Sequence, residues 1–129
     1  MKTYLLERPG LPPLKIEGEL AGEATRSVDK RYYHVRLFTT GGISNQKEVI
    51  AVTFQSDWER ESEFHWVAAG STSEVGEQIS GWDVVPAGVG FPTGERYTEK
   101  QDRLVKQLKA AFALAISDAY KDAGLFDEF

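Results

Sequence analysis

The sequence feature that most constrains the fold lies near the C-terminus, where residues 98–124 carry a helical pattern of apolar positions. At about 100° per residue, these apolar side chains fall within one arc roughly 140° wide. They are Leu104, Val105, Leu108, Ala111, Phe112, Ala115, Ile116 and Ala119. A helix with such a stripe needs a large apolar surface to pack against, so the rest of the chain must supply that surface.

Both ends of this helix carry sequence signals. Thr98 followed by Gln101 fits a capping box, in which side chains satisfy backbone N–H groups that lack helical partners. Gly124 can adopt the left-handed conformation that ends a helix, and Leu125 can then fold back towards Tyr120. The expected helix therefore spans residues 98–124.

The chain before this helix changes to a period of two, which is typical of strands. We predict strands over residues 2–7, 14–20 (able to continue over 23–27), 31–40, 47–55 and 63–69, and a short helix over 71–82. Short polar connections and the absence of a βαβ rhythm favour an antiparallel meander. The predicted fold class is α+β: one domain, residues 1–129, in which about five antiparallel strands carry the long helix across one face.

Two details of the second strand lead to further expectations. Residues 8–13 read RPGLPP and are predicted to be a turn, because proline is excluded from a sheet interior. Gly18 falls on the same face as Leu14, Ile16 and Leu20, which we expect to point inward. A glycine there predicts a bulge or a close approach of helix to sheet.

Alternation assigns the central strands two faces. The face expected to meet the helix carries Tyr33, Val35, Leu37, Ile50, Val52, Phe54, Phe64 and Trp66. The outer face carries Tyr32, His34, Arg36, Phe38, Ala51, Thr53, His65 and Val67. That outer face is neither clearly polar nor clearly apolar, which makes it the candidate ligand or partner face, with Tyr32, His34, Arg36, Phe38 and His65 as its proposed site residues.

Composition narrows the classes of function. The chain has no cysteine, which excludes disulfides and thiolate chemistry, and its net charge of −5 argues against broad electrostatic binding of nucleic acid. The N-terminal residues lack an apolar core of signal-peptide length, and no apolar run is long enough to span a bilayer. We therefore expect a soluble cytoplasmic protein with no membrane partner.

Three functional hypotheses follow from these residues. The first is a non-catalytic binding or assembly module, homodimeric through the outer face or through the side of the long helix that carries Leu114. The second is single-stranded nucleic-acid binding through the aromatic and basic side chains of the outer face. The third is a small-molecule or metal site near His34 and His65, with Glu61 and Glu63 of the E-x-E-x-H run as further metal ligands.

Catalysis has little support in the sequence. No Gly-x-Ser-x-Gly elbow is present, and neither histidine has a local partner pattern. The sequence favours a non-catalytic function, leaves enzymatic activity open, and identifies no catalytic residue, resident metal or cofactor.

Overall fold

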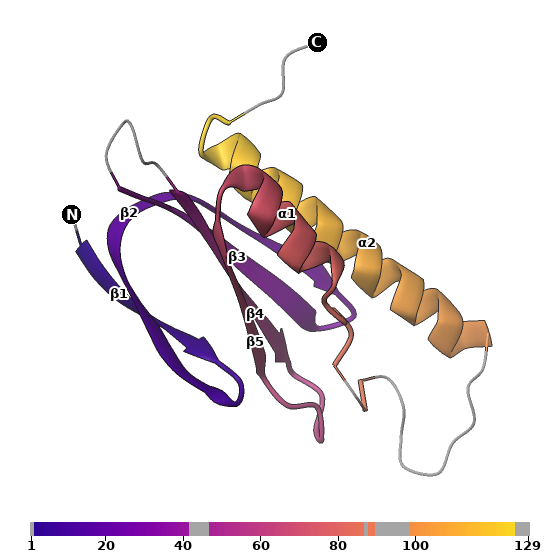
Figure 1. Ribbon diagram of the computed structural model, residues 1–129. Coiled ribbons are helices and arrows are strands. Elements are labelled where there is room, and N and C mark those ends of the chain that lie inside the picture. The colour runs from indigo at the N-terminus through magenta and orange to yellow at the C-terminus, as the bar shows by residue number, and fades with distance from the viewer. Residues whose placement is uncertain (1, 42–46, 87, 90–98, 126–129) are drawn as a thin grey trace.

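The computed structural model describes residues 2–41, 47–86, 88–89 and 99–125. These residues form a five-stranded antiparallel sheet, a short helix and a long C-terminal helix, as the sequence predicts (Figure 1). The elements are β1 (Lys2–Arg8), β2 (Leu11–Val28), β3 (Arg31–Thr40), β4 (Lys47–Ser56), β5 (Phe64–Gly70), α1 (Thr72–Ser80) and α2 (Glu99–Asp122). The strands lie in the order β1-β2-β3-β4-β5, so the predicted meander is confirmed.

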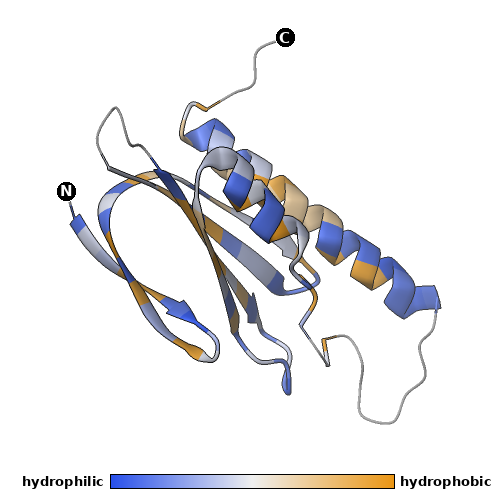
Figure 2. Cartoon of the chain, viewed as in Figure 1, coloured by the Kyte–Doolittle hydropathy of each residue, from blue (hydrophilic) through white to orange (hydrophobic). Residues whose placement is uncertain are grey.

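The main core lies between the sheet and the two helices, which cover the same face (Figure 1). The predicted inward residues Tyr33, Val35 and Leu37 of β3 are fully buried there. Phe64 departs from the prediction: it is the first residue of β5 and is 36% exposed, with its ring centroid 4.7 Å from that of Trp66. Figure 2 shows the matching pattern on α2, whose middle is apolar while its first turn is hydrophilic.

The opposite face of the sheet is partly covered by the chain itself. The hairpin of β1 and the first half of β2 bends away from the helices (Figure 1). The ring of Tyr4 in β1 thereby comes within 4.6 Å of the ring of Phe38 in β3, centroid to centroid. Strands two positions apart in a flat sheet are separated by about 10 Å, so this contact requires the sheet to curl. The result is a second, smaller core built from Leu6, Ile16, Phe38, Val49 and Ala51.

A β-bulge in β2 allows one strand to serve both cores. Leu20 pairs with Phe38, whereas Gly22 pairs with Leu37, so the register shifts between Leu20 and Gly22. Since paired residues share a face, the even-numbered positions point to the second core before the shift and to the main core after it. The prediction of one common inward face for Leu14, Ile16 and Leu20 is corrected by this geometry: Ile16 is buried in the second core, and Leu20 is 40% exposed.

The bulge and the close helix approach are both at Gly22 rather than at Gly18. A Cβ on Gly22 would lie 2.3 Å from the backbone oxygen of Ala119 in α2. A Cβ on Gly18 would instead meet the backbone oxygen of Thr39 in β3 at 2.3 Å. Gly18 thus allows close contact between strands, and Gly22 allows close contact between sheet and helix.

The turn between β1 and β2 is shorter than predicted. It consists of Pro9 and Gly10, and Pro12 and Pro13 belong to β2. Among the described residues, β2 pairs with β3 from Gly18 onward, so Pro12 and Pro13 lie outside the described part of this pairing.

The helix ends follow the sequence signals where they are described. Gly124 has φ +74°, and the N–H of Leu125 donates to the oxygen of Tyr120 at 2.9 Å, as predicted. Thr98 lies outside the described residues, and with it the predicted capping box. In α1, Ser71 and Glu74 form a complete capping box. Neither α1 nor α2 combines the length and apolar character that crossing a membrane requires, within the described ranges.

Candidate polar ligand site

The candidate site lies on the sheet face opposite the helices, here called the concave face. The helix-covered face is filled by the main core, so its side chains are unavailable to a ligand. The concave face has two ends. Its apolar end is filled by the second core, and its polar end carries Tyr32, His34 and His65.

A row of polar side chains crosses four strands at the polar end. Thr25, His34, Thr53 and His65 are direct cross-strand partners in β2, β3, β4 and β5. The hydroxyl oxygen of Thr25 lies 2.7 Å from Nδ1 of His34, and that of Thr53 lies 3.2 Å from Nδ1 of His65. The two imidazoles are therefore two strands apart, about 10 Å between Cα atoms, with Thr53 between them.

Carboxylates lie beside both histidines. Nε2 of His65 lies 3.1 Å from Glu63 and 3.4 Å from Glu7 of β1. Nε2 of His34 lies 3.6 Å from Glu23 of β2. Hydrogen bonds from Gln55 and then from His65 lower the pKa of Glu63, so that carboxylate is ionised at neutral pH.

Next to this row is an open depression of about 370 Å³. It is lined by Tyr32, Gln55, Ser56, Asp57 and Glu63. The Tyr32 hydroxyl donates to Asp57 at 3.2 Å, and this hydrogen bond raises the pKa of Tyr32. The Gln55 amide donates to Glu63 at 2.8 Å. The lining thus offers hydroxyl, amide and carboxylate groups, which suit a ligand recognised through hydrogen bonds better than an anion.

The predicted site residues fall into two groups. Tyr32, His34 and His65 are half-buried at the polar end. Arg36 is also half-buried, with its guanidinium carbon 5.5 Å from the centre of the Phe38 ring. Phe38 itself is fully buried in the second core. The structure thus places four of the five residues along an accessible surface and the fifth beneath it.

The E-x-E-x-H run does not converge as the metal hypothesis requires. Glu63 lies beside His65, but the Glu61 carboxylate turns to Arg31 instead. Across the described residues, no three side chains of the His, Asp and Glu types are grouped to hold a metal ion.

Some residues of the site were not singled out from the sequence. Gln55 has the same alternation parity as Thr53 in β4, so the pattern that placed Thr53 on this face could also have placed Gln55. Thr25 reaches the face only because of the bulge in β2, which leaves no periodic signal in the sequence.

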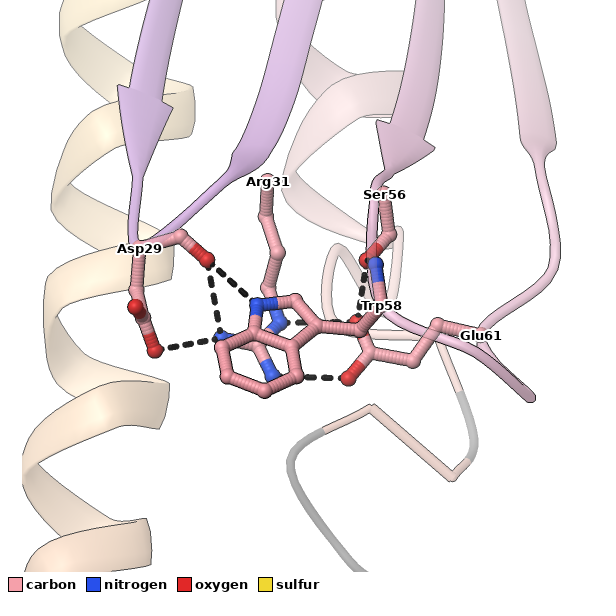
Figure 3. A network of polar contacts seen from close by, with 5 residues as sticks. All are labelled: Asp29, Arg31, Ser56, Trp58 and Glu61. Atoms are coloured by element: carbon pink, nitrogen blue, oxygen red, sulfur yellow. Dashed lines mark hydrogen bonds and ion pairs between the residues drawn. The ribbon is translucent and has the colours of Figure 1, made fainter.

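A network of buried charge adjoins the site (Figure 3). Arg31, at the start of β3 and only 4% exposed, donates through Nε and Nη2 to the two carboxylate oxygens of Glu61, each at 2.7 Å. Burial works against the charged guanidinium, but the bonds to Glu61 and Asp29 outweigh it and raise the pKa of Arg31. Ser56 donates a further hydrogen bond to Glu61 at 2.7 Å.

The structure therefore defines an α+β domain with a curled antiparallel sheet, a main core beneath the helices and a polar surface on the concave face. Comparison of the chain with protein-family models, with curated proteins and with solved structures found no match.

Proposed function

We propose that this chain is a non-catalytic binding module that recognises a small polar ligand at the polar end of its concave face. The observation that supports the proposal most strongly is the depression beside the threonine–histidine row. It is bordered by side chains from β3, β4 and the segment that follows β4. Polar groups that converge on an open hollow are typical of ligand sites.

The division of the concave face favours a ligand over a protein partner at this place. A protein interface has an apolar centre surrounded by a polar rim. Here the apolar end is already occupied by Leu6 and Ile16 of the chain's own hairpin. What is left open is polar, and its hydrogen-bonding groups are held in fixed positions by neighbouring strands.

The proposal is tested by NMR titration of the ¹⁵N-labelled protein with a panel of sugars, amino acids, nucleosides and polyamines. At least one class should shift the amide resonances of Tyr32, Gln55 and Glu63. Gln55→Ala should weaken that binding about fivefold, because one good hydrogen bond is worth about 1 kcal/mol. The matched control is Gln107→Ala, on an exposed position of α2, which should leave binding unchanged. Shifts spread evenly over the molecule, or none with any class, would refute the site.

A homodimer is the second candidate, and the side of α2 that carries Leu114 is its best-supported interface. Leu114 is 47% exposed on the face of α2 turned away from the main core. Sedimentation at high micromolar concentration tests for the homodimer. A profile that contains only monomer would exclude it. A cytoplasmic location is likewise a proposal, which the cysteine-free composition supports.

Single-stranded nucleic acid is the weaker alternative. It would use Tyr32, His34 and Arg36, but both histidines of this face already lie beside carboxylates. A phosphate backbone approaching the polar end would meet those carboxylates, and like charges repel. The test is binding of a fluorescent oligonucleotide at low salt. Binding to the protein that is weakened in Arg36→Ala would favour nucleic acid over a small polar ligand.

A further inference from the structure

We infer that Arg31 is a positioning residue for the polar end: through Glu61 and Trp58 it fixes residues 57–63, which bring Asp57 and Glu63 to the depression. This inference rests on the proposed function only for the identity of what binds there. The fixing of the segment itself is a property of the chain and can be measured without a ligand.

The segment 57–63 connects β4 to β5 and contributes to two different places. Asp57 and Glu63 line the depression on the concave face. Trp58 and Glu61 lie between them in the chain and contact Arg31. The positions of the two lining carboxylates therefore depend on what holds the residues between them.

Arg31 binds this segment with a defined geometry. Its planar fork makes two parallel bonds to Glu61, and the Glu61 side chain is only 7% exposed. A buried ion pair contributes little net stability, because desolvation offsets the attraction. Its planar, bidentate geometry does fix direction, and a lysine at the same place cannot reproduce it.

Further contacts join the segment to the turn between β2 and β3 (Figure 3). The guanidinium carbon of Arg31 lies 5.3 Å from the centre of the Trp58 ring. The indole N–H of Trp58 donates to the backbone oxygen of Asp29 at 2.6 Å. The backbone N–H of Asp57 donates to the oxygen of Lys30 at 3.0 Å. Arg31 also donates to the Asp29 carboxylate at 3.2 Å, so one side chain contacts both the turn and the segment.

The backbone of the segment needs such a restraint. Arg60 has φ +71°, a left-handed conformation that residues other than glycine rarely adopt. Such a conformation is strained and persists only where surrounding contacts enforce it. Loss of the Arg31 fork should therefore release this segment locally while the sheet stays folded.

The test is amide hydrogen exchange, measured by NMR, on Arg31→Lys. Lysine keeps the positive charge and removes the fork. We expect exchange of the Asp57 amide to become at least tenfold faster, while amides in β3 and β4 keep their rates. The control is Arg26→Lys, which alters an exposed pair with Asp118 and should leave the Asp57 amide unchanged.

Two results would overturn the inference: an unchanged Asp57 amide, or faster exchange spread equally over the whole sheet, which would indicate a merely structural role. If Arg31→Lys does not fold, Glu61→Gln decides, because it keeps Arg31 and removes the charge that the fork binds. Its Asp57 amide should also exchange faster, and an unchanged rate would overturn the inference. No ligand is used, so a failed titration panel and a failed positioning role give different results.

Discussion

At the scale of single residues, two glycines in β2 have different functions that a local pattern cannot separate. Both fall on positions of the same parity, and both are buried. What distinguishes them is the neighbour that a side chain would meet: the backbone of β3 at Gly18 and the backbone of α2 at Gly22. The closeness of sheet and helix therefore depends on one residue, Gly22.

Gly22→Ala tests this dependence. The added methyl group would lie 2.3 Å from the oxygen of Ala119 and 2.8 Å from the nitrogen of Ala123, so α2 would have to move. We expect a loss of about 1–3 kcal/mol in the free energy of unfolding, the usual range for overpacking. Urea denaturation followed by circular dichroism measures it.

The control for this prediction is Gly76→Ala in α1, where a Cβ would meet nothing within 4 Å. Alanine is a better helix former than glycine, so the free energy of unfolding of this variant should rise by about 0.5–1 kcal/mol. Equal effects of the two substitutions would contradict the role assigned to Gly22.

At the scale of elements, β2 is the strand that gives the sheet its two cores. Because of its bulge between Leu20 and Gly22, the even-numbered side chains of β2 face the second core in the first half of the strand and the main core in the second half. The hairpin of β1 and β2 is therefore a cover over Phe38 rather than a flat extension of the sheet.

Leu6→Ala and Leu5→Ala test the role of this hairpin as a matched pair from one strand. Leu6 is 1% exposed in the second core, so its truncation should lower the free energy of unfolding by about 2–5 kcal/mol. Leu5 points the other way and is 68% exposed, so its truncation should change stability by no more than about 0.5 kcal/mol. Chemical denaturation of both variants gives the comparison, and similar losses would mean that the second core does not form.

The sequence predicts those elements whose periodicity is unbroken. The stripe of α2 and the alternation of β3 and β4 predicted burial of Leu108, Val35 and Val52, because each element turns a regularly spaced apolar face to the main core. The bulge at Gly22 left no such signal, since β2 alternates without interruption in sequence while its face changes in space. Phe38 was therefore expected on an open face, although the hairpin buries it.

The candidate site was only partly predictable for the same reason. Alternation placed Tyr32, His34 and His65 on one face correctly, because parity within β3 and β5 needs no long-range information. It could not show which part of that face the hairpin covers, nor that Glu61 turns to Arg31. Both depend on contacts between residues distant in the chain.

At the scale of the whole molecule, the sheet is covered on both sides but not completely. The helices cover one face, the hairpin covers the apolar end of the other, and the polar end around His34 and His65 is left accessible. The proposed function follows from this arrangement. If the sheet were flat, Phe38, Val49 and Ala51 would form an exposed apolar patch, and dimerisation through that face would be the better hypothesis.

The most direct test of this central claim is a nuclear Overhauser measurement between the ring protons of Tyr4 and Phe38 in solution. The curled sheet holds their ring centroids 4.6 Å apart, so strong cross-peaks between the two rings are expected. A flat sheet would separate β1 from β3 by about 10 Å, beyond the reach of the effect. Cross-peaks would support the covered apolar end and the open polar end together, and their absence from a fully assigned spectrum would contradict the account.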